Sequence, residues 1–273
     1  MAISASGIEQ ALAPSIAALA RIPQPFRVLD LEGRPIGFEP QLSADELRSM
    51  YRWMLFGRQL DERGLQLQRQ GRLGVWGPMV GQEAAQVGLG QAIRQGDWIF
   101  PSYREAIALS MRGLGLTDLF AYYRGLYWVA NPLETGVFPV QIVIGDQSLH
   151  AVGAGMGFAL QRQPHVAVGV VGDGATSQGD FMEALNFSGA FNAQTVLFVQ
   201  NNHWAISMPR DRQTASETIA QKGLGHGVTG VLVDGNDALA VYAVSQWAIE
   251  HARSGAGPVL VEALTYRLGA HTT

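Results

Sequence analysis

Short apolar runs alternate with helical stretches over the second half of the chain. The runs of strand length cover residues 166–171, 195–200, 230–234 and 258–264. Residues 180–191 and 238–253, which lie between them, keep a helical period. Buried strands that alternate with helices are typical of a parallel sheet covered on both faces. We therefore predict an α/β fold with a doubly wound, mostly parallel sheet flanked by helices.

The first half of the chain has the pattern of helices joined by glycine-rich loops. Ser43, followed by Glu46, forms a capping box, and the helical period beyond it predicts a long helix. The Ala-rich stretch before it is weakly amphipathic, which predicts an N-terminal helical extension that Pro23 and Pro25 interrupt. The sequence thus predicts an arm over residues 1–45 and one domain over residues 46–273.

Composition and charge exclude several classes of protein. Apolar residues make up 47% of the chain, charged residues 15%, and the net charge is −4, so no basic surface for nucleic acid is expected. No apolar run approaches the roughly 20 residues of a membrane span. The absence of cysteine fits a reducing compartment, and the N-terminus lacks a signal or transit pattern, so we expect a cytoplasmic protein. The sparse charge favours a surface that other subunits cover.

Two polar features follow two of the predicted strands. Gly172-Asp173-Gly174 ends the first apolar run, and Asn202 comes 29 residues after Asp173 (202 − 173), at the end of the second. Ligands of open parallel sheets bind at the carboxyl ends of the strands, so neighbouring strands would bring both side chains to one crevice. A carboxylate and an amide oxygen suit Mg²⁺ with a phosphate ligand. The backbone N–H groups of Gly174 and Ala175 are candidate phosphate donors.

The same features have simpler interpretations. A Gly-Asp-Gly triplet is more often only a turn, and adjacent asparagines usually belong to loops. The segment is not a dinucleotide fingerprint, because Ser177 replaces the third glycine, and it is not a P-loop, because it lacks the lysine. The spacing alone leaves the choice between a turn and a site open.

Several blocks in the same order resemble a known family. They include "PSYREAIALSMRG", "QIVIGDQSLHAVG", "GDGATSQGDFMEALNFSGAFNA", "FVQNNHWAIS" and "GPVLVEALTYRLGAHT". From about Arg48 to Thr273 the chain resembles the alpha subunits of the thiamine-diphosphate-dependent 2-oxo-acid dehydrogenases. These are the first components of the pyruvate and branched-chain complexes. The resemblance implies the thiamine-diphosphate-binding fold, with thiamine diphosphate and Mg²⁺ as cofactors. It also implies oxidative decarboxylation of a 2-oxo acid, with acyl transfer to a lipoyl group.

The resemblance assigns roles to individual residues. It implies that Mg²⁺ is bound by the side chains of Asp173 and Asn202 and by the backbone carbonyl of Trp204. The implied cofactor contacts are Tyr103, Arg104, Gly174 and Ala175 at the diphosphate and the backbone of Ile142 and Ile144 at the aminopyrimidine ring. His271 matches the catalytic histidine of a mobile loop in the family. Four residues fall where relatives line the acyl pocket: Val75, Trp76, Ser102 and Ile144. Their mixture of bulky and small side chains allows pyruvate or a branched 2-oxo acid as the substrate, and we favour pyruvate.

The resemblance also implies partners and shows departures. It implies a beta subunit in an α2β2 heterotetramer and the lipoyl domain of a dihydrolipoyl acyltransferase. The segment "LYWVANPLETG" lacks a histidine that many relatives have, and Asp146 stands where a small residue is common. We also expect the C-terminal portion of the family to be missing here. An acetoin dehydrogenase alpha subunit and a catalytically silent structural or regulatory homologue therefore stay as alternatives.

Overall fold

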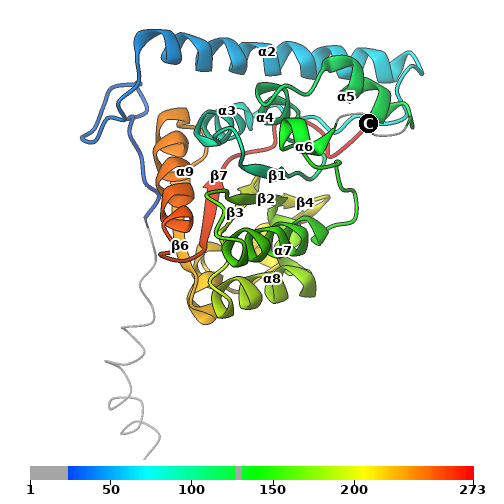
Figure 1. Ribbon diagram of the computed structural model, residues 1–273. Coiled ribbons are helices and arrows are strands. Elements are labelled where there is room, and N and C mark those ends of the chain that lie inside the picture. Colours follow the sequence, from blue (N-terminus) through cyan, green and yellow to red (C-terminus); the bar gives the residue numbers. More distant parts are fainter. Residues whose placement is uncertain (1–23, 127–130) are drawn as a thin grey trace, which may run out of the picture.

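A five-stranded sheet forms the centre of the computed structural model, which describes residues 24–126 and 131–273 (Figure 1). All its paired strands run parallel, in the order β1-β2-β3-β7-β6. The strands are β1 (Trp98–Phe100), β2 (Ala167–Gly172), β3 (Thr195–Asn201), β6 (Thr229–Asp234) and β7 (Val259–Leu264). The predicted parallel sheet is confirmed. The structure adds the edge strand β1, which the sequence did not predict because a run of three residues is too short to show a pattern.

Helices cover both faces of this sheet, which confirms the doubly wound arrangement. The helix α9 (Ala238–Arg253) packs on one face together with α3 (Glu83–Ala92), and α7 (Asp146–Leu160) and α8 (Gly179–Ala190) cover the other (Figure 1). Val196 and Phe198 of β3 belong to the first apolar core, whereas Leu197 and Val199 belong to the second. Because both of its faces are buried, the strand is apolar at successive positions rather than alternating.

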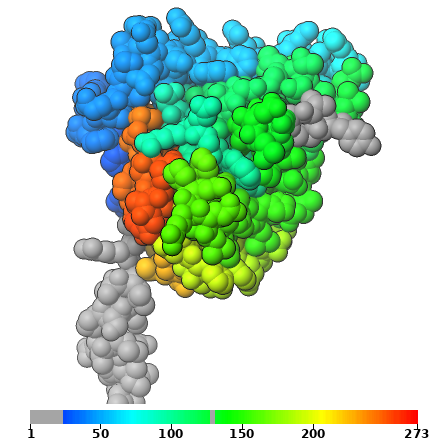
Figure 2. Space-filling view, viewed as in Figure 1, coloured from blue at the N-terminus to red at the C-terminus, as the bar shows by residue number. Residues whose placement is uncertain are grey.

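The long helix α2 (Ala44–Arg69) begins at the predicted capping box. The Glu46 N–H donates to Ser43 Oγ at 3.2 Å, and the Ser43 N–H donates to the Glu46 carboxylate at 2.7 Å. Two glycines let this helix approach the domain closely. A Cβ at Gly57 would lie 2.2 Å from the Ile107 side chain, and a Cβ at Gly64 would lie 2.2 Å from the Trp76 ring. The helix forms a ridge along one side of the molecule (Figure 2).

Shorter elements complete the described chain. They are α4 (Ala106–Met111), α5 (Leu116–Tyr123), α6 (Pro132–Thr135), the 3-10 helices η1 (Asp173–Ser177), η2 (Arg210–Arg212) and η3 (Ala220–His226), and the small hairpin of β4 (Trp204–Ala205) and β5 (Met208–Pro209). Within the described residues, no helix has the length and apolarity needed to cross a membrane.

The segment before α2 lies against the edge of the sheet. The Phe26 N–H donates to the Leu232 carbonyl at 2.9 Å, and Asp237 accepts hydrogen bonds from the N–H groups of Val28 and Leu29. The helical extension predicted near the N-terminus falls on residues 1–23, outside the described residues. The domain boundary at residue 45 therefore stays a prediction.

Candidate cofactor site and active site

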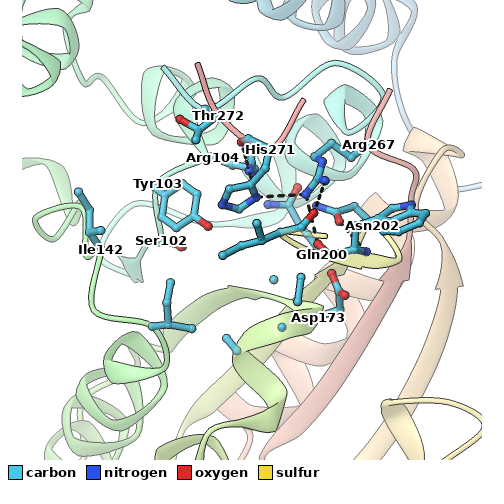
Figure 3. A pocket seen from close by; sticks show the side chains of 18 of the residues that line it. Ser102, Tyr103, Arg104, Ile142, Asp173, Gln200, Asn202, Arg267, His271 and Thr272 are labelled. Carbon is cyan, nitrogen blue, oxygen red and sulfur yellow. Dashed lines mark hydrogen bonds between the residues drawn. The ribbon is translucent and has the colours of Figure 1, made fainter. Parts of the chain in front are cut away.

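A cavity of about 490 Å³ opens at the carboxyl ends of the central strands (Figure 3). Asp173 follows β2 and Asn202 follows β3, and these strands are hydrogen-bonded neighbours, with Gly172 paired to Gln200. The predicted convergence of Asp173 and Asn202 on one crevice is therefore confirmed. The predicted site residues that line the cavity are Val75, Ser102, Tyr103, Arg104, Ile142, Ile144, Asp173, Gly174, Ala175, Asn202, Trp204 and His271.

Trp76 is the predicted pocket residue that the structure places elsewhere. Its side chain is 1% exposed and is not among the residues that line the cavity. The indole Nε1 donates to Asp61 at 2.7 Å, and the ring packs against Tyr123 with centroids 5.0 Å apart. Neighbouring side chains of this extended segment point in different directions, so Val75 reaches the cavity while Trp76 enters the core. The pocket prediction for Trp76 is wrong for this reason.

Each predicted metal ligand already accepts a hydrogen bond from the protein. Asp173 Oδ2 accepts from Gln213 Nε2 at 2.9 Å, Asn202 Oδ1 from the Trp204 N–H at 3.2 Å, and the Trp204 carbonyl from Arg267 at 3.3 Å. Burial raises the pKa of Asp173, although the Gln213 hydrogen bond opposes this shift. An oxygen that accepts one hydrogen bond keeps a second lone pair. The assignment of these three oxygens to Mg²⁺ stays a prediction.

Two guanidinium groups meet the predicted catalytic histidine in the cavity, and one of them, that of Arg267, reaches the Trp204 carbonyl (Figure 3). His271 Nδ1 lies 2.9 Å from Arg104 Nη2 and 3.1 Å from Arg267 Nη1. Burial and these two charges lower the pKa of His271 to about 4. The imidazole is therefore neutral at pH 7, with Nδ1 as the acceptor and the proton on Nε2. The Tyr103 ring flanks the group, 6.2 Å from the imidazole centroid.

In the described part of the chain, the side chains of these two arginines donate to backbone carbonyls and to His271 rather than to a carboxylate. Arg104, 7% exposed, donates to the Pro78 carbonyl at 2.6 Å, and Arg267 donates to the Ile206 carbonyl at 2.7 Å. Neither forms an ion pair with a described carboxylate. Asp173 and Glu105 act electrostatically on the guanidiniums of Arg267 and Arg104 without pairing with them directly. Two adjacent, partly buried cations without an ion pair in the described residues favour an anionic ligand.

The glycines around Asp173 give backbone access to the cavity. A Cβ at Gly174 would lie 2.6 Å from the Ala205 Cβ, so this position requires glycine. At Gly172, which also lines the cavity, no heavy atom lies within 4 Å of the Cβ position. The backbone there is therefore bare toward the space that a ligand would fill. The predicted phosphate contacts of the Gly174 and Ala175 N–H groups stay a prediction.

Sequence reasoning missed several polar residues of the cavity. Glu105 accepts from Gln200 Nε2 at 2.8 Å, and burial raises the pKa of Glu105 to about 7. Gln82 contacts Asn202. Gln147 accepts a hydrogen bond from the Gly145 N–H and donates one to the Gln141 carbonyl, and these two bonds hold the loop that carries the two predicted isoleucines. Arg267 was missed as well. Glu105, Gln147 and Arg267 lie inside the quoted blocks "PSYREAIALSMRG", "QIVIGDQSLHAVG" and "GPVLVEALTYRLGAHT", and this was the signal that could have found them.

The fold and the cavity define a class: an α/β protein with a cavity at the carboxyl ends of its parallel strands, where two guanidinium groups favour an anionic ligand. Residues 51–273 match the family described as "Dehydrogenase E1 component". The chain is 45% identical over 254 residues to the 3-methyl-2-oxobutanoate dehydrogenase subunit alpha of Mycobacterium tuberculosis (92% of this chain, 69% of the relative). It is 44% identical over 241 residues to the pyruvate dehydrogenase E1 component subunit alpha of Acholeplasma laidlawii (86% and 68%), and 42% over 251 residues to that of Bacillus subtilis (90% and 67%).

The chain belongs to the dehydrogenase E1 component family, which confirms the prediction from the sequence. It spans about two thirds of the length of these relatives. Membership makes it part of an oxidoreductase, implies the use of thiamine diphosphate, and implies a complex with a partner subunit. The names of the relatives divide between two 2-oxo acids at nearly equal identity, so identity does not decide the substrate.

Proposed function

We propose that this chain is the alpha subunit of a 2-oxo-acid dehydrogenase whose cavity holds thiamine diphosphate with Mg²⁺ and accepts pyruvate or a branched-chain 2-oxo acid. The observation that supports this most directly is the pair of guanidiniums of Arg104 and Arg267, which form no ion pair within the described residues and line the same cavity as Asp173 and Asn202. A diphosphate supplies charged acceptors for these guanidiniums, and its oxygens complete a Mg²⁺ shell that the protein offers only in part.

The residues present fit this cofactor. Asp173 and Asn202 supply a carboxylate and an amide oxygen, the ligand types that Mg²⁺ prefers. Within residues 24–126 and 131–273, no group of three His, Cys, Asp or Glu side chains gathers to bind a metal. A metal ion at this site therefore depends on ligands beyond acidic and imidazole side chains, which a carbonyl and a diphosphate provide. The bare backbone at Gly172 leaves room for the phosphate.

The residues of this chain have different roles in the proposed reaction. Tyr103 and Arg104 hold the diphosphate through a phenol and a guanidinium, and Ile142 and Ile144 contact the aminopyrimidine ring through their backbone. When bound, the thiazolium ring supplies the electron sink for loss of CO₂ from a 2-oxo acid. His271, neutral at pH 7, presents its Nε2 proton and can donate or move that proton near the substrate.

The acyl group of the substrate lies beside small and apolar side chains in this proposal. Val75, Ser102 and Ile144 all line the cavity. A pocket of this kind separates pyruvate from a branched acid only weakly, because each methylene is worth about 1–3 kcal/mol. The arrangement therefore supports a short aliphatic 2-oxo acid as the substrate class.

Partner subunits complete the proposed enzyme. Ile142 and Ile206, which line the cavity, are more than half exposed. So are Val143 and Leu268, which directly follow the lining residues Ile142 and Arg267 in the sequence. Exposed apolar side chains of this density are typical of a covered surface. We assign this surface to a beta subunit in an α2β2 heterotetramer. In this proposal the heterotetramer lies in the cytoplasm and passes its acyl product to the lipoyl domain of an acyltransferase.

Calorimetry with thiamine diphosphate and Mg²⁺, on the chain co-purified with its partner subunit, tests the cofactor assignment. Saturable binding that requires the metal is expected, and no binding at high cofactor concentration contradicts the proposal. Assays of CO₂ release from pyruvate and 3-methyl-2-oxobutanoate, and of acetaldehyde release from acetoin, then identify the substrate. Turnover of acetoin alone would contradict the 2-oxo-acid assignment, and cofactor binding without any turnover would favour a silent homologue.

A further inference from the structure

Gln82 carries a buried amide at the cavity, and only one end of this amide has a partner among the described residues. The residue directly precedes α3, lines the cavity, and is 1% exposed. Its Oε1 accepts a hydrogen bond from Asn202 Nδ2 at 3.1 Å. Its Nε2 is buried and, among the described residues, has no hydrogen-bond acceptor. Buried donors are rarely left unpaired, so this nitrogen indicates a missing ligand atom.

The hydrogen bonds around Asn202 identify the nitrogen of Gln82 as the unpaired end. The Trp204 backbone N–H can only donate, and it donates to Asn202 Oδ1 at 3.2 Å. The Asn202 Nδ2 group must therefore face Gln82, and the atom that receives its hydrogen bond must be Gln82 Oε1. A flipped Gln82 amide would place two N–H₂ groups against each other.

We infer that Gln82 is a further cofactor-binding residue: its Oε1 orients the Asn202 amide, and its Nε2 donates a hydrogen bond to the diphosphate. This inference rests on the proposed function. The diphosphate is the ligand part that suits an unpaired donor, because its oxygens are charged acceptors. The contact to Asn202 places the donor next to a proposed metal ligand, where the diphosphate must come to complete the metal shell.

The next turn of the same helix offers a matched control. Gln86 is also 1% exposed, its Oε1 accepts from the Ile107 N–H at 3.0 Å, and its Nε2 is also buried without a partner among the described residues. Gln86 does not line the cavity. Gln86→Met therefore removes the same kinds of interaction as Gln82→Met, at the same depth, without removing a group from the site.

Calorimetric titration of the subunit complex with thiamine diphosphate at saturating Mg²⁺ tests the inference. Gln82→Met is expected to raise Kd roughly tenfold to one-hundredfold, the loss typical of a hydrogen bond to a charged group. Gln86→Met should bind as the wild type does. Thermal midpoints without ligand, measured for both variants, show whether each is folded before the affinities are compared.

A second variant separates the donor role from the orientation of Asn202 and stays informative if Gln82→Met does not fold. Gln82→Glu keeps an oxygen for Asn202 Nδ2, but its carboxyl can donate only when protonated. Its affinity for thiamine diphosphate, relative to the wild type at each pH, should therefore improve as the pH is lowered from about 8 to about 6. A ratio that stays constant over this range would contradict the inference.

The outcomes distinguish the two proposals. If the wild-type complex binds thiamine diphosphate and Gln82→Met binds it equally well, the inference about Gln82 is wrong and the proposed function stands. The same holds if Gln82→Glu shows wild-type affinity at every pH. If the wild-type complex binds no thiamine diphosphate, the proposed function fails and the inference fails with it.

Discussion

Replacement of Arg104 by methionine should raise the pKa of His271, because the guanidinium lies 2.9 Å from the imidazole Nδ1. The pKa falls from the usual 6.5 to about 4, with burial as the largest cause, followed by the charges of Arg104 and Arg267. Since burial is the largest of the three, Arg104 accounts for less than half of the fall. The expected increase is about one unit, a tenfold change in proton affinity.

Titration of the histidine ring protons by NMR measures this change. The chain has six histidines, and the His271→Gln variant identifies the resonance that belongs to His271. Arg34→Met is the matched control, because Arg34 is exposed and pairs with Asp30 and Glu32 instead. A His271 pKa that stays near 4 in Arg104→Met would refute the assignment of this charge effect.

The same shift predicts how stability depends on pH. The folded chain has the lower pKa at His271, so between pH 6.5 and about 4 the unfolded chain binds more protons. This site therefore lowers the free energy of unfolding as the pH falls through that window. In Arg104→Met the folded pKa is higher, so the loss between pH 7 and pH 5 should be smaller. Equal losses in urea titrations of both proteins would contradict the prediction.

Two further substitutions test the metal site and the scaffold. Asp173→Ala should abolish Mg²⁺-dependent binding of thiamine diphosphate, and wild-type affinity by calorimetry would show that Asp173 is not a ligand. Arg253→Met removes the guanidinium that meets the fully buried Asp97 carboxylate at 2.8 and 2.9 Å. Two backbone N–H groups still donate to Asp97 in this variant. We therefore expect the free energy of unfolding to fall by about 3 kcal/mol, the lower end of the range for a broken buried ion pair, which lowers Tm by roughly 6–12 °C. Arg34→Met, at an exposed pair, should cost about 0–1 kcal/mol, and equal Tm shifts for the two would contradict the argument.

Local sequence patterns were sufficient for most of the fold. Apolar runs of strand length and helical periods predicted the central sheet and its covering helices, and Ser43 with Glu46 predicted the start of α2. The juxtaposition of Asp173 and Asn202 also followed from the sequence, because both lie at carboxyl ends of successive parallel strands. In each of these cases the information lies within one segment or one strand-helix-strand unit, where backbone geometry decides the outcome.

The tertiary structure decided what surrounds these two residues. The sequence contained nothing to separate Val75, at the cavity, from its neighbour Trp76, in the core. Gln82 meets Asn202 across 120 positions, and Arg104 meets His271 across 167. Such contacts depend on how distant segments pack, and packing leaves no period in the local sequence. The sequence by itself therefore determined the family, the sheet and the two residues at its strand ends. Three features follow only from folding, because each depends on charges and hydrogen bonds between distant segments. Within the described residues, these are the two guanidiniums without an ion pair, the neutral histidine and the Gln82 nitrogen without an acceptor.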